Sequence, residues 1–213
     1  MIIAARESFA AAARRRLPYD EEVEYLESTG TQYIDTGFVA TSNTNVEVDF
    51  ALASIRNGSI FGARKGLGRS AFGVRLLSYQ SVPRYRWDYG STDVYLVSID
   101  VTVGRHTLVT SGNKITYDSS ASGTVASAFS SSGLNVVIFA LNDNGSVNTY
   151  SNELRVRRFS ILDAGVLVRD FIPVRIGRVG YLYDRAHPAG GPSGNGLYGN
   201  NGTGAFVVGP DIN

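Results

Sequence analysis

The sequence predicts an all-β fold, a two-sheet antiparallel sandwich that follows a short N-terminal helical arm. Beyond residue 18 the chain consists of short period-two segments rich in Val, Ile, Thr, Tyr and Phe, separated by clusters of Gly, Asn, Asp and Ser. Tight-turn signals between these segments indicate hairpins and therefore antiparallel pairing. The first 17 residues differ, because they are rich in alanine and arginine and place Ile2 and Phe9 near one helical face.

Nine segments have the clearest strand pattern, at 45–51, 59–63, 71–77, 84–89, 106–111, 114–118, 135–140, 154–163 and 166–173. The Gly112-Asn113 pair predicts a two-residue hairpin loop, and Gly165 predicts another tight connection. Within 45–51, alternation directs Val46, Val48 and Phe50 to the core. The stretch 188–204 carries seven glycines and is predicted to be an extended loop.

Residues 1–19 are expected to form a partner-docking arm, and residues 20–213 a single sandwich domain. A helix this short is marginal in water, so its order requires buried apolar contacts. We expect an apolar set to bury against a partner and a basic set to meet acidic groups at the rim: Ile2, Ile3 and Phe9, then Arg14, Arg15 and Arg16. The alternative is a helix that packs on its own sandwich.

Composition excludes several classes of protein. Lys and Arg total 20 against 19 Asp and Glu, so no global field attracts nucleic acid. No run approaches the roughly 20 apolar residues that span a bilayer, and the arginines follow the apolar residues instead of preceding them as in a secretion signal. The sequence has no cysteine, so disulfides and thiolate sites are absent. Neither nucleic acid nor membrane is an expected partner.

Three segments carry a resemblance to a known family: VEYLESTGTQYIDTGF at 23–38, SNELRVRRFSILDAGVLVRDFIPVR at 151–175 and GLYGNNGTGAFVVGP at 196–210. Together they resemble the concanavalin A-like lectin/glucanase (LamG-like jelly-roll) domains of gut bacteriophages and prophages, and of surface proteins of their hosts. The resemblance covers about residues 21–210 and includes a Tyr183-Asp184 turn before the last strand. It implies a jelly-roll sandwich but specifies little about the ligand.

Hydrolase chemistry on this fold uses a strand motif E-x-D-x-x-E, whose carboxylates act as nucleophile, helper and general acid/base. Here Glu47 and Asp49 match the first two positions, while Leu52 occupies the third. Without the proton donor we expect no enzyme, and the two carboxylates are interpreted as charges on a solvated strand face.

Metal and cofactor sites are not expected either. The two histidines, His106 and His187, lie far apart and have no zinc-binding spacing. The Asp143-Asn144-Gly145 and Asp163-Ala164-Gly165 segments could offer oxygens to calcium, but turn chemistry explains them better.

The segment 84–89 alternates charge with aromatic rings. One face offers Tyr85, Trp87 and Tyr89, and the other offers Arg84, Arg86 and Asp88. If the rings face inward they are ordinary core packing, which is the favoured interpretation. If they face outward they form a stacking platform for sugar rings and are the candidate carbohydrate-binding residues.

The function expected from these features is that of a non-enzymatic bacteriophage virion protein, such as a head fibre, decoration protein or tail-associated receptor-binding module. It would be assembled in the host cytoplasm as a homo-oligomer, dock on other virion proteins through the arm, and present the sandwich to a cell-surface glycan. The alternative is a carbohydrate-binding module or adhesin at the surface of a gut bacterium. The two functions differ in their essential part: a virion protein needs the arm for assembly, whereas a binding module or adhesin needs the sugar site.

Overall fold

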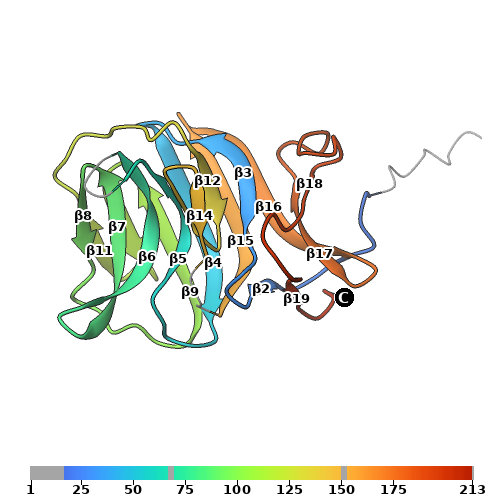
Figure 1. Ribbon diagram of the computed structural model, residues 1–213, viewed down its shortest axis with the longest axis horizontal. Helices are drawn as coiled ribbons and strands as arrows, with labels where there is room; N and C mark the ends of the chain where they lie inside the picture. The colour runs from blue at the N-terminus through green and yellow to red at the C-terminus, as the bar shows by residue number, and fades with distance from the viewer. Residues whose placement is uncertain (1–16, 67–69, 150–152, 213) are drawn as a thin grey trace, which may run out of the picture.

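The fold is an all-β sandwich, described here from a computed structural model for residues 17–66, 70–149 and 153–212. Residues 1–16 of the predicted arm, which include Ile2, Ile3, Phe9 and the three arginines, lie outside these residues, and residues 17–19 are described and not helical. The described residues contain no helix that could cross a membrane. All nine predicted strands are present within a residue or a few of their predicted bounds, so the expected two-sheet arrangement is confirmed (Figure 1).

The larger sheet has eleven strands. Its main path runs in the order β11 (Ala121–Thr124), β10 (Lys114–Tyr117), β9 (Gly104–Ser111), β4 (Thr44–Leu52), β15 (Leu154–Asp163), β16 (Val166–Ile176), β17 (Val179–Asp184) and β18 (Leu197–Tyr198). The short strands β1 (Glu21–Glu22), β2 (Leu26–Ser28) and β19 (Val207–Val208) join it at β16, β15 and β2. Every pairing in this sheet is antiparallel.

The smaller sheet has eight strands. Its main path runs β14 (Ser146–Asn148), β13 (Leu141–Asp143), β5 (Gly58–Arg64), β6 (Ala71–Tyr79), β7 (Val82–Gly90) and β8 (Thr92–Tyr95), and β12 (Asn135–Ile138) joins β5 to β3 (Ile34–Val39). One short pairing, of β13 with β5, is parallel, and the others are antiparallel.

The main core lies between the two sheets and is built from the period-two pattern. Val46, Val48 and Phe50 are buried as predicted, because alternate residues of β4 face the smaller sheet. Phe61 on β5 meets Phe159 on β15 across the sandwich, with ring centroids 5.3 Å apart. A second, smaller cluster lies on β16–β18 and includes Val174, Tyr183 and Leu197.

The predicted tight turns are confirmed. β9 ends at Ser111 and β10 begins at Lys114, which leaves a two-residue loop with Gly112 at φ 55°. β15 and β16 are joined by Ala164 and Gly165, both with positive φ. The stretch 188–204 is mostly loop, as expected, but it also contains β18.

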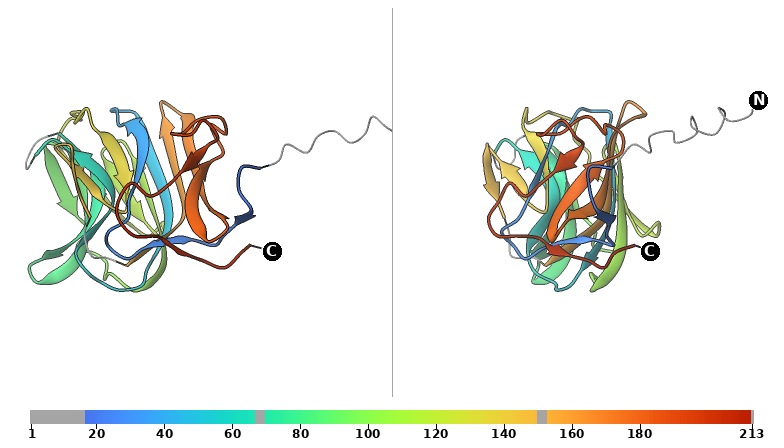
Figure 2. Two further views of the ribbon diagram at one scale, coloured as in Figure 1. Left: turned by 45° about the vertical axis from the view of Figure 1, so that its right-hand side comes forward. Right: turned by 90° about the vertical axis from the view of Figure 1, so that its right-hand side faces the viewer.

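Both described ends of the chain lie at one end of the sandwich. The amide of Ile212 donates to the carbonyl of Glu22 over 2.9 Å, and Val23 forms a bridge with Asp211. In Figure 1 this end, with β17 and β19, is on the right, whereas β6, β7 and β8 form the left end; the turned views of Figure 2 show the same separation. The strands β6, β7 and β8 of the smaller sheet therefore lie away from the described chain ends.

Candidate ligand-binding site

The two faces of β7 have opposite roles. Tyr85 and Trp87 are fully buried and Tyr89 is 5% exposed, so all three rings face the main core. Trp87 packs edge-on against Phe72 with centroids 5.0 Å apart. These rings are core packing and cannot act as a sugar platform, because their large apolar area is buried between the sheets. The candidate carbohydrate-binding assignment of this aromatic row is therefore corrected.

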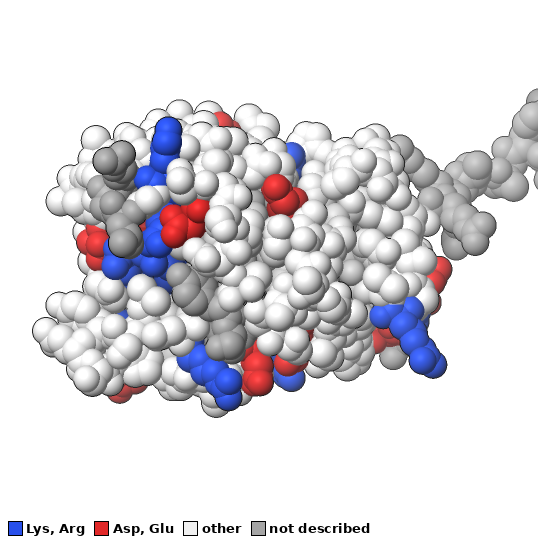
Figure 3. Space-filling view, viewed as in Figure 1, with Lys and Arg blue, Asp and Glu red and all other residues white. Residues whose placement is uncertain are grey.

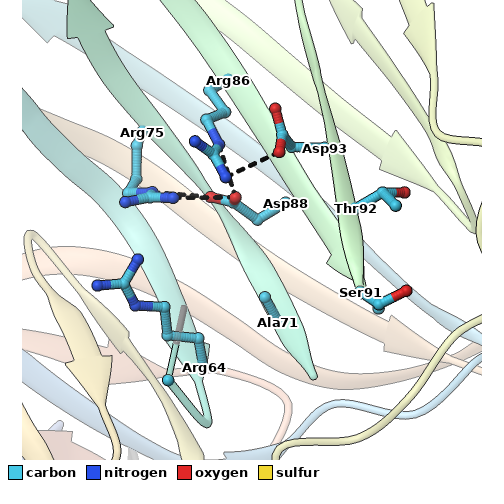
Figure 4. A pocket seen from close by; sticks show the side chains of 10 residues that line it. Arg64, Ala71, Arg75, Arg86, Asp88, Ser91, Thr92 and Asp93 are labelled. Atoms are coloured by element: carbon cyan, nitrogen blue, oxygen red, sulfur yellow. Dashed lines mark hydrogen bonds and ion pairs between the residues drawn. The ribbon is translucent and has the colours of Figure 1, made fainter. Parts of the chain in front are cut away.

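The charged face of β7 forms an ion network on the outside of the smaller sheet (Figure 4). Register places like charges directly opposite each other, Arg75 against Arg86 and Asp88 against Asp93, which is unfavourable by itself. This repulsion is offset by ion pairs between diagonal neighbours, Arg75–Asp88 and Arg86–Asp93, and by one pair within β7, Arg86–Asp88. Asp88 accepts two hydrogen bonds from Arg75, at 2.7 and 2.9 Å, and one from Arg86 Nε at 2.8 Å. Arg86 also pairs with Asp93 at 2.8 Å.

A small polar pocket of about 30 Å³ lies among these side chains. Arg64, on the neighbouring β5, borders it and pairs with Asp143 of β13 at 2.6 Å. This hydrogen-bonded guanidinium holds the pKa of the Asp143 carboxyl below its usual value. Exposed Ser91 and Thr92 lie at the rim. Since a water needs roughly 10–15 Å³, the pocket has room for one water-sized group, such as a ligand hydroxyl.

Arg86 connects this pocket to an aromatic stack. Its Nη1 donates to the hydroxyl of Tyr95 over 3.2 Å, and its guanidinium carbon lies 5.5 Å from the centroid of the Tyr95 ring. Tyr95 in turn stacks on Tyr79, with centroids 4.3 Å apart and planes at 27°. Tyr79 ends β6 beside a two-residue turn and is 37% exposed. A supported aromatic ring therefore stands next to the charged network.

The charged network is balanced, with three arginines and three aspartates. In the space-filling view, basic and acidic surfaces adjoin at this end of the molecule (Figure 3). Arg75 and Asp88 are each 5% exposed and satisfy each other, so they hold the sheet face in shape. The groups that can meet a ligand are the more exposed ones: the Tyr79 ring, the Ser91 and Thr92 hydroxyls, and Asp93.

The carboxylates considered for hydrolysis lie elsewhere, on the outer face of the larger sheet. Glu47 is exposed, and Asp49 forms two hydrogen bonds with Arg105, at 2.9 and 2.6 Å. Leu52 is buried in the core. This placement matches two charges on a solvated strand face and brings no third carboxylate onto β4.

Metal ligands are not gathered in the described part of the chain, where no three His, Asp, Glu or Cys side chains cluster. His106 instead has one ring nitrogen 2.8 Å from Asp118 and the other 3.0 Å from the carbonyl of Thr102. His187 lies 3.7 Å from Asp184 at the opposite end of the sandwich.

Sequence reasoning identified Arg86 and Asp88 as one face of a strand but did not identify their partners. Arg64, Arg75, Asp93 and Tyr95 come from other strands, and strand register alone brings them together. The available signal was the alternation of Arg and Asp on 84–88. When charged residues alternate with aromatic residues along a strand whose aromatic face is buried, the charged side chains lie on the opposite face and need oppositely charged partners on neighbouring strands.

The comparisons with known proteins assign the chain to no family. No family model matches the chain, and no curated protein matches it. Among solved structures it is similar to the NanB sialidase of Streptococcus pneumoniae in a complex with an ethanesulfonate ligand, at 12% identity and a TM-score of 0.44 over 69% of this chain and 27% of that chain. A point mutant of the same sialidase matches at 10% identity and a TM-score of 0.45, over 90% and 40%. The chain spans less than half of either sialidase chain.

Proposed function

We propose that this chain is a non-enzymatic recognition module that binds a polyhydroxylated ligand, such as a cell-surface glycan, on the outer face of its smaller sheet. The observation that carries the proposal is Arg86, which joins a hydroxyl-sized polar pocket to the Tyr95–Tyr79 stack. Sugar rings present an apolar C–H face together with hydroxyl groups. A supported aromatic ring beside polar groups matches both features.

Rigidity of the site supports this function. Asp88 and Asp93 fix the Arg86 guanidinium from two sides, and the guanidinium fixes Tyr95. The exposed ring of Tyr79 is then supported from behind by Tyr95. A preorganised surface loses less conformational entropy on binding, which favours recognition of weakly interacting ligands.

A glycan array probed with the labelled full-length protein tests the proposal. Tyr79→Ala should weaken binding to any glycan bound at this site about fivefold, since a ring contact contributes about 1 kcal/mol. Tyr79→Phe keeps the ring and should retain most of the affinity. Tyr25→Ala is the matched control, because the Tyr25 ring also lies against an arginine, with the Arg155 guanidinium carbon 4.6 Å from its centroid, but just before β2 of the larger sheet. Absence of glycan binding, or equal binding by Tyr79→Ala, overturns the proposal.

Attachment to a larger assembly, such as a bacteriophage particle, is a second part of the proposed function. Its support is the direction in which the chain enters the sandwich. Tyr19 packs on Tyr183 with centroids 5.0 Å apart, and the Asp20 amide donates to the Arg175 carbonyl. Both contacts lie at the end opposite β7 and β8, so a partner that holds residues 1–17 would leave the proposed glycan site free (Figure 1).

Deleting residues 1–17 tests the assembly role. The truncated protein should keep glycan binding but no longer co-sediment with its particle. Phe9→Ala should weaken binding to the particle more than Arg15→Ala, because buried apolar area stabilises a complex more than exposed ion pairs do. Unchanged incorporation of the truncated protein would exclude the anchoring role.

A further inference from the structure

A second cavity lies at the other end of the sandwich, where the glycine-rich stretch 188–204, which includes β18, lies beside β17. It is a groove of about 320 Å³, at the lower end of the roughly 300–1,000 Å³ that ligand sites occupy. Tyr181 and Leu197 contribute its aromatic and aliphatic surface. Its polar lining comes from Ser193, Asn195, Asn200 and Asn201.

The groove is held in shape by hydrogen bonds to a distant segment. The Asn200 Oδ1 accepts from the amides of Tyr33 and Gly202, at 3.2 and 2.8 Å, and its Nδ2 donates to the carbonyl of Gly204. The amide of Thr203 donates to the carbonyl of Thr31 over 3.1 Å. One wall of the groove is therefore fixed to the segment between β2 and β3, and it is preorganised without a ligand.

Glycine keeps the chain close to the aromatic rings. A Cβ on Gly199 would come within 3.3 Å of the Tyr181 ring. Gly196 has φ +77°, and a Cβ there would lie 2.8 Å from the Tyr183 ring. Side chains at these positions would press on the rings beneath, so glycine allows the loop to pass directly over them.

Two amide groups in the lining have unused donors. Asn195 Oδ1 accepts from the Leu197 amide over 3.2 Å, and Asn201 Oδ1 accepts from the Asp35 amide over 2.9 Å. The Nδ2 of each donates to no residue of the described ranges 17–66, 70–149 and 153–212. Each side chain is thus oriented by its oxygen while its NH₂ group remains available to a ligand.

The lining contains no charged side chain among the described residues. This distinguishes it from the pocket around Arg86 and disfavours a ligand that needs charge compensation. We propose that this groove is a second binding site, which takes a neutral saccharide by contact of its ring face with Tyr181 and by hydrogen bonds from Asn195 and Asn201 to its hydroxyls. The inference is independent of the proposed site on the smaller sheet.

The test uses the full-length protein, isotope-labelled, with a panel of neutral sugars as probes: glucose, galactose, mannose, N-acetylglucosamine and their disaccharides. Binding at the groove should shift the side-chain amide resonances of Asn195 and Asn201, and high salt should leave the affinity unchanged because no charges are involved. If no sugar of the panel shifts these resonances at high millimolar concentration, the inference is overturned.

Two variants locate the binding. Asn195→Asp keeps the oxygen that accepts from Leu197 but loses the NH₂ donors, and should weaken binding roughly fivefold or more. Ser193→Phe places a large side chain at an exposed position of the lining and should abolish binding without a change in the core. Asn45→Asp is the matched control, because Asn45 Oδ1 likewise accepts a backbone amide, that of Gly112, on the larger sheet.

Comparison with Tyr79→Ala separates the two sites. Groove binding should survive Tyr79→Ala and be lost in Ser193→Phe. A sugar whose affinity is unchanged in both Asn195→Asp and Ser193→Phe is not bound in the groove, and that result also overturns the inference. Loss of all sugar binding in Tyr79→Ala would instead assign the saccharide to the smaller sheet.

Discussion

Removal of one carboxylate should destabilise the protein strongly, although that carboxylate lies on the outer face of a sheet. Asp88 and Arg75 are each 5% exposed and form a bidentate pair at 2.7 and 2.9 Å. Asp88→Asn preserves size and one acceptor oxygen but leaves the Arg75 charge buried without a counter-charge. Arg86 retains Asp93, so most of the loss falls on Arg75.

The expected loss follows from that burial. Breaking a buried pair by removal of one partner costs about 3–5 kcal/mol, because the remaining charge is desolvated without compensation. Replacing both partners by apolar side chains avoids that cost. The double variant Arg75→Met/Asp88→Leu should therefore recover most of the stability lost in Asp88→Asn, despite lacking the ion pair altogether.

Urea denaturation of the wild type, the single variant and the double variant measures both effects. The midpoint for Asp88→Asn should fall with little change in the slope m, and the double variant should lie between it and the wild type or above. A loss below about 1 kcal/mol in Asp88→Asn, or a double variant less stable than the single one, would refute the assignment of a buried, mutually dependent pair.

Three further outcomes follow from the described contacts. Burial raises the pKa of Tyr117 from 10.0 to about 12, so the stability gained from its neutral form is fully present below pH 10 and is lost as the pH rises through about 12. Ultraviolet difference spectroscopy should therefore show one tyrosine that ionises well above pH 10. Ionisation of every tyrosine near pH 10 without unfolding would contradict this. The Arg64 guanidinium lowers the pKa of the Asp143 carboxyl, so the ion pair stabilises the fold above the usual pKa of an aspartate, and this stability is lost as the pH falls through the lowered pKa. Asp143→Asn should therefore reduce the pH dependence of the free energy of unfolding at acid pH, measured by urea denaturation. An unchanged pH dependence would argue against the pair. We also expect no release of reducing sugar from laminarin, because Leu52 is buried where a third carboxylate is required; release that Glu47→Gln abolishes would show the chain to be a hydrolase.

The sandwich could be predicted from the sequence because its long strands carry a clear period-two pattern. β15 was predicted with its observed bounds, and β4 within one residue at each end. Strands of two to four residues, such as β1 and β18, are too short to show a period and depend on tertiary pairing. The residues of the β6–β7 turn were not predicted, since Gln80 and Ser81 adopt positive φ and neither is a glycine.

The candidate site was predictable only in part. The pattern of 84–89 assigned Arg86 and Asp88 to one face and the aromatic residues to the other, but a period of two cannot specify which face is buried. Packing decided it, because three large rings bury more apolar area than the opposite face offers. The partners from β5, β6 and β8 depend on register, which local sequence does not encode.

The register itself explains why this face is suited to recognition. With Arg75 opposite Arg86 and Asp88 opposite Asp93, direct cross-strand neighbours repel, and the favourable contacts must run diagonally. A one-residue slip of β7 would turn its charges into the core, so the network reinforces one register. The same contacts that enforce this register also fix Arg86 against Tyr95. Selection of a single sheet register and preorganisation of the exposed Tyr79 ring are thus two consequences of one set of ion pairs.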